Sequence, residues 1–532
     1  MATVDAAACK CYPSDTCWPS SADFNTLNET VGGRLIETLP IGSPCHDPNY
    51  NAKDCIDLQQ QWRSELLHLS SSSSVMQPFF ANNSCDPFQP RQIPCQLGNY
   101  VRYAVNASSV EDVQAAVNFA REKNIRFVIR NTGHDYLGRS TGAGSLSVWT
   151  HYLKGIEVVD FSSVGYSGKA MKFGAGIQGF EAMEVGKAHG LIVVGGECPT
   201  VGLAGGYTQG GGHSALSTSF GLAADNALSW EIVLSNGSFV TASRKENEDL
   251  FWALSSGGAS TLGGAFLIFL ADKNDPETFY NAIRVFHDML PRFVDAGTMV
   301  VYTFTKSYFI MSPVTAYNKS KAQVQGIVGP FIREVKALGL LHYNFFTESD
   351  SYYDHYNTFF GPLPYGLIKI GGSQYAGRLI PRSVITDITL TNTSREIVEQ
   401  NVVWVGVATN VGPHGSNTTS SVNPAWRDAL VHAVVTVPFN FTAAWQHNVA
   451  LQDKLTNNIM PLLEAVTPGS GSYVNEGDFR QPYFQEVFWG SNYEKLLGIK
   501  NRYDAEELFY ATVGVGSESW EIMEDGRMCH PS

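Results

Sequence analysis

The sequence predicts an α+β protein that folds into two lobes. The chain has 532 residues, which is more than one compact core usually accommodates. Residues 91–275 alternate short strands with helices and carry two glycine-rich stretches. Residues 276–470 instead group their strands and helices as in an antiparallel sheet backed by helices. A hydrophobic content of 44% and a charged content of 16% suit a compact core.

The segment 1–90 has a different character from the rest of the chain. It is rich in Pro, Ser, Asn and Cys, and it contains a serine run at 70–74. Such a composition favours irregular structure, with room for a short helix near 58–67. We therefore expect this segment to wrap over the surface rather than to form a domain with its own core.

Cysteines are concentrated in the same segment. The chain has nine cysteines, of which Cys198 lies in a glycine-rich stretch treated below. The other eight are an even number and mostly clustered, which is typical of disulfides in an oxidising compartment. Zinc explains Cys9 and Cys11 less well, because no nearby pair completes four ligands, and we expect no metal. Cys529 is expected to pair with one of the N-terminal cysteines, while the connectivity stays open.

Glycosylation signals point to the same compartment. Asn-x-Ser/Thr sequons occur at Asn28, Asn82, Asn106, Asn236, Asn318, Asn392, Asn417 and Asn440. Eight such signals suit a secreted protein that carries N-glycans. The N-terminus has no basic and apolar leader, which alone would favour the cytosol. Together the cysteines and sequons favour a mature secreted chain whose signal peptide is absent from this sequence.

Net charge and hydropathy exclude two classes of partner. A formal charge of −14 disfavours nucleic acid and anionic membrane surfaces, which require a basic face. The best apolar run, 265–271, is too short to span a bilayer and is typical of a buried strand. We expect no membrane partner and a monomeric protein.

Periodicity predicts the elements of the first lobe in order. Expected strands cover 100–105, 125–129, 171–174 and 191–194, and a hairpin joins 230–234 to 239–242 through the turn at 235–238. A helix starts at Ser109 with Asp112 three residues later, and a second helix covers 180–189 before Gly190. The strand at 125–129 leads directly into the first glycine-rich stretch.

The second lobe is expected to contain the following elements. Strands cover 299–304, 343–346, 402–408 and 433–437, and helices cover 321–338, 394–400 and 448–465.

Two glycine-rich stretches, 129–139 and 198–213, hold the residues with the clearest chemistry. Each contains one residue that can act as a nucleophile, His134 in the first and Cys198 in the second. Glycine allows close approach of the backbone to a ligand, and successive N–H groups in such turns bind a pyrophosphate. Neither stretch is a Walker loop or a Rossmann fingerprint. Taken separately, each stretch could be an ordinary turn, the first with a structural histidine and the second with a packed thiol. Taken together, the two stretches suggest a large dinucleotide held from two sides.

These motifs resemble those of a known family. Arg130–His134, Arg-Asn-Thr-Gly-His, is similar to the Arg-Ser-Gly-Gly-His motif of FAD-linked oxidases of the berberine-bridge-enzyme-like group, in the vanillyl-alcohol-oxidase superfamily. Cys198–Gly202 resembles the second signature of that group, and 221–226 and 249–253 continue the match in order. Asn131 and Thr132 depart from the family motif, and the second loop is one residue longer than in plant members.

The resemblance implies a fold and a cofactor. It implies a PCMH-type FAD-binding domain over 91–275, a substrate domain over 276–470 whose sheet faces the flavin, and a segment, 471–532, that returns to the FAD domain. It also implies that FAD is held bicovalently, with His134 on the 8α-methyl carbon and Cys198 on C6. The resemblance implies further cofactor contacts from Arg130, Asn131, Thr132, Gly133, Asp135, Gly138, Val201, Gly202, Gly205, Gly206, Gly211, Gly212, His213, Gly221, Leu222, Asp225, Val233 and Asn475.

Three residues are candidates for the catalytic side of the site. Glu476 follows a Tyr-x-Asn pair, where relatives carry a tyrosine base, and we expect it to be the general base with a pKa raised by burial. A salt-bridging surface carboxylate is the alternative. Tyr473 is expected beside the flavin ring together with Asn475. His414 either lines the substrate pocket or is a solvated loop residue.

The function implied by the resemblance is that of a secreted oxidase. A small alcohol, phenol or sugar-type substrate gives a hydride to FAD, and O2 takes the electrons and leaves as H2O2. A flavin dehydrogenase that reacts poorly with O2 is the alternative enzyme. A catalytically silent glycosylated binding protein is the alternative from another class, although it would have no use for both His134 and Cys198.

Overall fold

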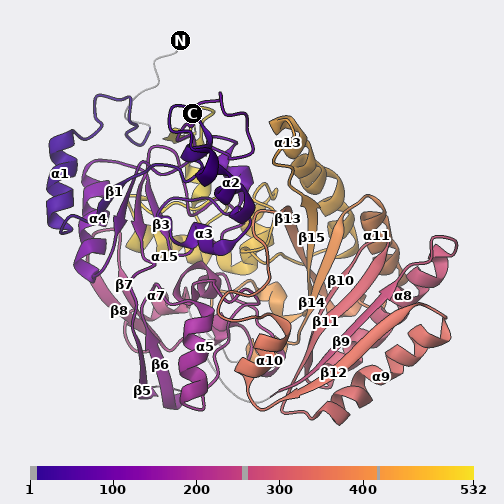
Figure 1. The fold of residues 1–532 in the computed structure, drawn as a ribbon. Helices are drawn as coiled ribbons and strands as arrows, with labels where there is room; N and C mark the ends of the chain where they lie inside the picture. The colour runs from indigo at the N-terminus through magenta and orange to yellow at the C-terminus, as the bar shows by residue number, and fades with distance from the viewer. Residues whose placement is uncertain (1–8, 164, 255–261, 416–419, 532) are drawn as a thin grey trace.

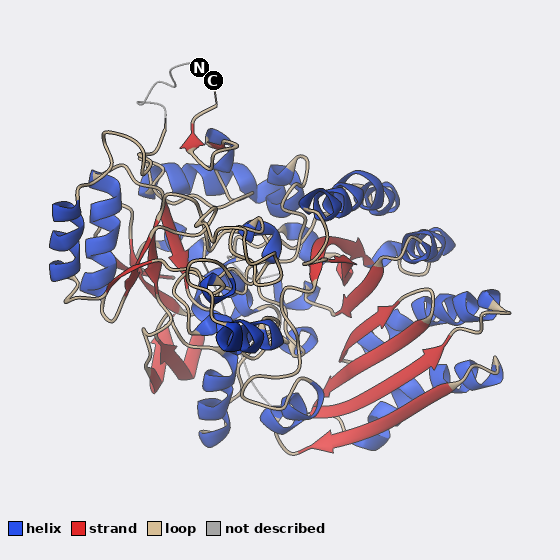
Figure 2. Cartoon of the chain, turned by 45° about the horizontal axis from the view of Figure 1, so that its top comes forward, coloured by secondary structure: helices blue, strands red, loops and turns tan. Residues whose placement is uncertain are grey.

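A computed structural model describes residues 9–163, 165–254, 262–415 and 420–531. Figure 1 shows two lobes side by side, with the indigo-to-magenta half of the chain forming the first and a pink-to-orange sheet dominating the second. The predicted α+β class is confirmed, and so is the antiparallel sheet backed by helices (Figure 2). The sequon at Asn417 lies outside the described residues.

A four-stranded sheet forms the base of the first lobe. Its strands lie in the order β1 (Leu35–Glu37), β2 (Tyr103–Asn106), β4 (Leu146–Trp149) and β3 (Phe127–Arg130). β2 and β3 each run parallel to β4, whereas β1 is antiparallel to β2. Helix α4 (Val110–Glu122) connects β2 to β3 and begins as predicted, with the Ser109 hydroxyl accepting from the Asp112 N–H. This β-α-β order places the first glycine-rich stretch at the end of β3.

The N-terminal segment is more than a wrap. It supplies β1 to the edge of the sheet, and α1 (Ser21–Thr30) buries Phe24 and Leu27 against the α4 side of the core. The single helix expected near 58–67 is two helices, α2 (Ala52–Gln61) and α3 (Glu65–Leu69). Much of the segment is irregular, as its composition predicted. Residues 21–30 form a helix because their apolar side chains pack on the core of the first lobe.

Two hairpins and one helix complete the surroundings of the second glycine-rich stretch. β5 (Ile156–Ser163) pairs with β6 (Tyr166–Phe173), and the predicted hairpin is confirmed as β7 (Ser229–Val233) with β8 (Phe239–Ser243). α5 (Gly179–Ala188) lies one residue from its predicted position. The strand predicted at 191–194 was wrong, because this extended segment has no neighbouring strand to pair with among the described residues. Short helices α6 (Ser217–Phe220) and α7 (Glu248–Trp252) follow.

The second lobe is built on a seven-stranded sheet in which every neighbouring pair is antiparallel. Its order is β12 (His342–Ser349), β9 (Leu262–Leu270), β11 (Tyr308–Tyr317), β10 (Thr298–Phe304), β14 (Val403–Ala408), β15 (Ala429–Pro438) and β13 (Ser373–Pro381). β9 falls within the range predicted for the FAD-binding domain, yet it pairs with β11 and β12 of this sheet. The structure therefore moves residues 262–270 from the first lobe to the second.

Helices cover one face of this sheet, as Figures 1 and 2 show. They are α8 (Pro276–Asp295), α9 (Lys321–Ala337), α11 (Ile388–Glu399), α13 (Trp445–Lys454) and α14 (Met460–Val466). α8 was not predicted, although Phe279, Ile283, Phe286, Leu290 and Val294 recur at helical spacing and are all buried. The other face of the sheet carries α10 (Tyr352–Phe359), whose Tyr352 and Tyr356 pack towards residues of the first lobe.

The tail of the chain returns to the first lobe. α15 (Tyr493–Tyr503) is followed by Phe509, which bridges to Phe127 of β3. The predicted link between the termini is confirmed as Cys9–Cys529, and the other disulfides are Cys11–Cys17, Cys45–Cys55 and Cys85–Cys95. Cys9 also pairs with Cys529 through an antiparallel backbone bridge, so the described ends of the chain lie together. Cys198 is left as a free cysteine.

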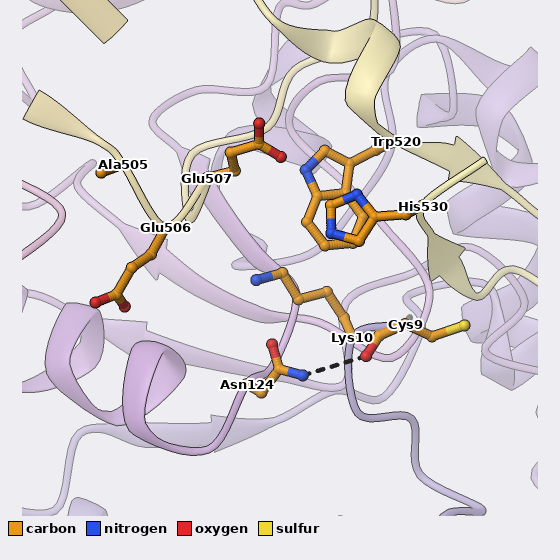
Figure 3. Close-up of a pocket in the computed structure, with 8 residues that line it drawn as sticks. All are labelled: Cys9, Lys10, Asn124, Ala505, Glu506, Glu507, Trp520 and His530. Atoms are coloured by element: carbon orange, nitrogen blue, oxygen red, sulfur yellow. Dashed lines mark hydrogen bonds between the residues drawn. The ribbon is translucent and has the colours of Figure 1, made fainter. Parts of the chain in front are cut away.

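The joined termini border a cavity of about 310 Å³ (Figure 3). Lys10 extends across it towards the stacked rings of Trp520 and His530, and burial lowers the pKa of the lysine. Its lining contains neither of the two predicted nucleophiles, so this cavity belongs to the closure of the chain ends. In the described part of the chain, no helix is long and apolar enough to cross a membrane.

Candidate active site

The two predicted nucleophiles lie next to each other. His134 Nε2 is 3.9 Å from Cys198 Sγ, although 64 residues separate them in the chain. The Thr200 hydroxyl contacts both, at 2.7 Å from His134 Nε2 and 3.6 Å from Cys198 Sγ. Burial lowers the pKa of His134 to about 4, with smaller contributions from Arg130 and His68, so the imidazole is neutral at physiological pH. Burial raises the pKa of the Cys198 thiol to about 11.

The first loop owes its shape to Asp135 and two glycines. Gly133 and Gly138 have φ values of +88° and +74°, which side chains other than glycine rarely adopt. The Asp135 carboxylate accepts from the backbone N–H groups of Leu137 and Ser140 and forms an ion pair with Arg139. Asp135 therefore organises the loop around His134, and its carboxylate is already engaged within the protein.

The Arg130 side chain contacts the N-terminal segment. Its guanidinium is buried and donates to the carbonyls of Ser74, His68 and Thr132. The side chain thus anchors the N-terminal segment beneath the His134 loop, and Thr132 is buried with it. The Arg130 side chain is thus engaged within the protein, and a cofactor contact from this residue stays a prediction.

The second loop packs on the first through Asn131. The Asn131 amide donates to the Ala175 carbonyl and lies so close to Gly202 that a Cβ there would approach its nitrogen to 1.9 Å. Asn131 Oδ1 is buried and has no hydrogen-bond partner among the described residues. Beyond this contact, Gly205 and Gly206 face open space, since no atom lies within 4 Å of a Cβ built on either. Val201 anchors the loop by accepting from the Gly179 N–H.

The tail of the chain holds the two loops together. Asn475 Oδ1 accepts from Arg139 of the first loop at 3.1 Å, and its Nδ2 donates to the Gly206 carbonyl of the second at 2.7 Å. The Tyr473 hydroxyl accepts from Asn475 Nδ2 and from the backbone N–H of Gly212, at 2.8 and 3.2 Å. Gly211 packs against the same tyrosine ring. Tyr473 and Asn475 therefore belong to the site.

Glu476 lies between two imidazoles. Its Oε1 is 3.0 Å from His213 Nε2 and its Oε2 is 2.8 Å from His432 Nε2. Burial alone would raise the pKa of Glu476, but the two histidines outweigh it and hold that pKa well below its usual range. The predicted rise was wrong, because neither histidine is near Glu476 in the sequence. Burial opposes protonation of His213, yet Glu476 raises the pKa of this imidazole to about 9. Burial lowers the pKa of His432.

The same three side chains offer the donor atoms of a metal site. Their ligand atoms lie within 4.8 Å of one another. Each Nε2 already bonds to the carboxylate, however, and neither Nδ1 has a partner among the described residues. Histidines that bind metals usually donate their second ring nitrogen to a neighbouring acceptor. The geometry therefore favours a hydrogen-bonded ion pair over a metal centre.

The sequence analysis missed Glu197, the residue before Cys198. Its Oε1 is buried and has no partner among the described residues. Burial raises the pKa of Glu197 to about 7, with Glu476 adding to the rise and His213 opposing it. Its position next to Cys198 was the one available signal, and burial cannot be read from a single position.

A stacked pair of tyrosines was also missed. The rings of Tyr136, from the first loop, and Tyr375, from β13, stack at 3.9 Å. The neighbouring Tyr375 and burial raise the pKa of Tyr136, and Glu476 and Cys198 raise it further. This pair therefore belongs to the surroundings of Cys198 and Glu476.

Five predicted residues lie in other surroundings. Both guanidinium nitrogens of Arg427 bind the Asp225 carboxylate, at 2.5 and 2.6 Å, so that acid is paired within the protein. His414 Nε2 lies 2.9 Å from the Thr218 carbonyl, and its Cβ packs against Gly221. Leu222 is fully buried beside Asp225, and Val233 ends β7. The structure does not bring His414 to Glu476.

Comparisons with known proteins give the family of this site. Residues 101–243 match the family model described as FAD binding domain, and residues 472–516 match that of berberine and berberine-like proteins. The chain is 56% identical to an FAD-linked oxidoreductase of Gibberella zeae, ZEB1, with 98% of this chain and 95% of that protein covered. The chain belongs to the berberine-bridge-enzyme-like FAD-linked oxidoreductases of the vanillyl-alcohol-oxidase superfamily.

Two further relatives support this membership. The FAD-linked oxidoreductase patO of Aspergillus clavatus is 43% identical over 98% of this chain and 95% of its own. The crystal structure of the flavoprotein MtVAO615 from Myceliophthora thermophila C1 superposes with a TM-score of 0.93 at 36% identity, covering 98% of this chain and all of that one. The resemblance stated from the motifs is confirmed, and the protein is an FAD-dependent oxidoreductase.

The residues of this oxidoreductase fit FAD. An imidazole and a free thiol meet at one end of the site, and open space lies beside Gly205 and Gly206. Asn131 Oδ1, Glu197 Oε1 and His213 Nδ1 are buried without a partner in the described protein, which leaves polar atoms for a ligand. His134, Cys198 and the loop 201–206 would therefore hold the cofactor.

Replacing Glu476 by Gln tests the ion pair with His213. The folded state lowers the pKa of Glu476, so the stabilisation from this carboxylate is complete above its pKa in the unfolded chain. The folded state raises the pKa of His213, so the stabilisation from this imidazole is complete below its pKa in the unfolded chain and is lost as the pH rises through about 9. We expect Glu476→Gln to lower the unfolding free energy of the flavin-loaded enzyme by about 3–5 kcal/mol near pH 5.5, and by less above pH 9. Urea unfolding at several pH values measures the difference.

Glu277→Gln is the matched control for this variant. Glu277 pairs with Arg395 at the surface with 72% of its side chain exposed, so solvent screens the pair and we expect a loss far smaller than that of Glu476→Gln. A Glu476→Gln effect as small as that of Glu277→Gln, or one that does not change with pH, would contradict the buried ion pair.

Proposed function

We propose that this oxidoreductase is a secreted oxidase in which His134 and Cys198 both bond covalently to FAD. The substrate is a small alcohol, phenol or sugar-type molecule that loses a hydride, and O2 is reduced to H2O2. The observation that carries the proposal is the 3.9 Å approach of His134 Nε2 to Cys198 Sγ. Two nucleophiles so close suit two neighbouring positions on one ring system.

The protein supplies orientation and proton transfer. Bound FAD supplies the hydride acceptor and passes the electron pair to O2. His134 and Cys198 fix one edge of the ring, while Asn475 and Tyr473 keep the two loops at a constant separation. The stacked rings of Tyr136 and Tyr375 offer an aromatic wall against which a planar phenol or a sugar packs.

We assign the role of general base to Glu197 in place of Glu476. A base works best when its pKa lies near the working pH, and the pKa of Glu197 is raised to about 7. Its unpartnered Oε1 is free to accept the proton of a substrate hydroxyl. Glu476, in contrast, accepts hydrogen bonds from histidines with both carboxylate oxygens and stays ionised. Its role is to keep His213 cationic, which stabilises negative charge on the substrate oxygen.

Secretion and N-glycosylation belong to the same proposal. Four disulfides support an oxidising compartment, and Asn82, Asn236, Asn318, Asn392 and Asn440 of the sequons are exposed.

Acid precipitation tests the covalent flavin. We expect the wild-type precipitate to stay yellow, and peptide mass spectrometry to find flavin on both His134 and Cys198. His134→Ala and Cys198→Ala should each keep flavin through the remaining bond, whereas the double variant should release all of it. A colourless wild-type precipitate would sink the proposal. Mixing reduced enzyme with air then measures H2O2, and reoxidation far slower than turnover would make the protein a dehydrogenase.

Replacing Glu197 by Gln tests the base, once a peroxide-release screen has given a substrate. The base must be ionised, so wild-type kcat/KM should rise as the pH increases through about 7. Glu197→Gln should lower kcat/KM by about 10²- to 10⁴-fold and remove this rise. Glu184→Gln, at an exposed position on α5, is the control and should leave the profile unchanged. A pH-dependent rise that survives in Glu197→Gln argues for another base.

Sequon occupancy tests secretion through the glycosylation pathway. The five exposed sequon asparagines can carry a glycan, whereas Asn106 lies in β2 with its Oδ1 buried. Peptide mapping after N-glycosidase treatment of the secreted protein should find glycans among the exposed sites and none on Asn106. Secreted protein without any glycan would contradict this part of the proposal.

A further inference from the structure

The backbone of Thr200 is held firmly beside the two nucleophiles. It is fully buried, and its carbonyl accepts from the Gln178 side chain at 3.0 Å. On either side of it, Pro199 accepts from the N–H of Phe180 and Val201 accepts from that of Gly179. The start of α5 therefore fixes the Thr200 backbone in the position from which its hydroxyl contacts both His134 and Cys198.

Once Cys198 is a thiolate, which can only accept, a single hydroxyl can serve both neighbours in only one arrangement. It has one proton to donate and lone pairs with which to accept. If His134 Nε2 carries the ring proton, it donates to Thr200 Oγ1 over 2.7 Å, and the hydroxyl proton is free to point at Cys198 Sγ, 3.6 Å away. His134 Nδ1 then keeps its lone pair and can act as a nucleophile. The opposite tautomer would protonate Nδ1 and take the hydroxyl proton for Nε2, which leaves a Cys198 thiolate without a donor.

We propose that Thr200 is a positioning residue for covalent attachment of FAD: its hydroxyl selects the His134 tautomer with a free Nδ1 and stabilises the Cys198 thiolate. The inference rests on the proposed bicovalent flavin and deepens it. Thr200 forms no bond to the cofactor itself and acts through the two residues beside it. One side chain thereby activates both linkages.

The two attachment steps are oxidations with the same stoichiometry. His134 Nδ1 forms a C–N bond to the 8α carbon, which loses one C–H hydrogen, while the imidazole loses its N–H proton. Cys198 forms a C–S bond to C6, which loses its hydrogen, while the thiol loses its S–H proton. In each step two electrons pass through the flavin ring to O2, which takes two protons and leaves as H2O2.

The Cys198 thiol depends on the Thr200 hydroxyl more than the His134 imidazole does. Burial raises the pKa of Cys198, and the Thr200 hydroxyl and backbone are the largest effects that lower it. The thiolate is the reactive form of cysteine, and every unit of added pKa removes about nine-tenths of it. His134 is neutral already and needs only the correct tautomer. Loss of the hydroxyl should therefore slow the Cys198 bond more than the His134 bond.

The test compares Thr200→Val with Thr200→Ser in the full chain expressed with FAD. Val matches Thr in shape and lacks the hydroxyl, whereas Ser restores it. Peptide mass spectrometry over time gives the flavin content of His134 and Cys198 separately, without any assay of turnover. We expect Thr200→Ser to form both bonds like the wild type. Thr200→Val should form the Cys198 bond at least about tenfold more slowly at pH 7, and recover as the pH rises.

A purely structural role for Thr200 would not produce this dependence on pH. Wild-type rates for both bonds in Thr200→Val would overturn the inference, and so would a defect that persists at high pH or in Thr200→Ser. Thr200→Ala, interpreted in the same way, replaces Thr200→Val if the latter does not fold. Wild-type protein with neither bond would overturn the proposed function and this inference with it.

Discussion

Asn475 bonds to both glycine-rich loops at once, and the arrangement of the site depends on it. Its carbonyl oxygen accepts from Arg139 of the His134 loop, and its amide donates to Gly206 of the Cys198 loop. Each bond is worth only about 0.5–1.5 kcal/mol to stability, but an unpaired partner in this partly buried place would cost more. The close contact of Asn131 with Gly202 joins the same loops at their other end. The separation of the two nucleophiles is set by these two amides.

Burial controls the chemistry of each reactive group in a different direction. It keeps His134 neutral and its neighbour Cys198 protonated, and it brings the pKa of Glu197 near neutrality. At Glu476 and His213, in contrast, the opposite charge of the partner outweighs burial. The site therefore combines one acid that is fixed in its ionised form with one that can exchange its proton, a division of roles familiar from paired catalytic carboxylates.

Local patterns predicted a large part of the fold. The cap at Ser109, the hairpin at 230–242 and the place of α5 depend on neighbouring residues, and all three are confirmed. The edge strand β1 and the transfer of β9 to the second sheet depend on pairing with distant strands, which no local pattern reports. The segment 191–194 shows the reverse case, in which a strand-like sequence finds no strand to pair with in the described part of the chain.

The candidate site divides in the same way. The motifs around His134 and Cys198 predicted two nucleophiles near one ligand, and the structure places them together. The partners of Glu476 could not be predicted, since His213 is 263 residues away and His432 is 44 residues away. The partners of the Arg130 side chain could not be predicted either, since they are carbonyls of residues 56 and 62 positions earlier in the chain.

The return of the tail to the first lobe has a consequence for how the protein matures. Asn475 and Glu476 reach the site only after nearly all of the chain has left the ribosome, and Cys529 must then meet Cys9 to close the ends. N-terminal segments emerge and begin to fold first during synthesis. The two glycine-rich loops therefore lack their contacts with Asn475 and Glu476 until the end of synthesis. Cofactor binding at the complete site follows translation instead of accompanying it.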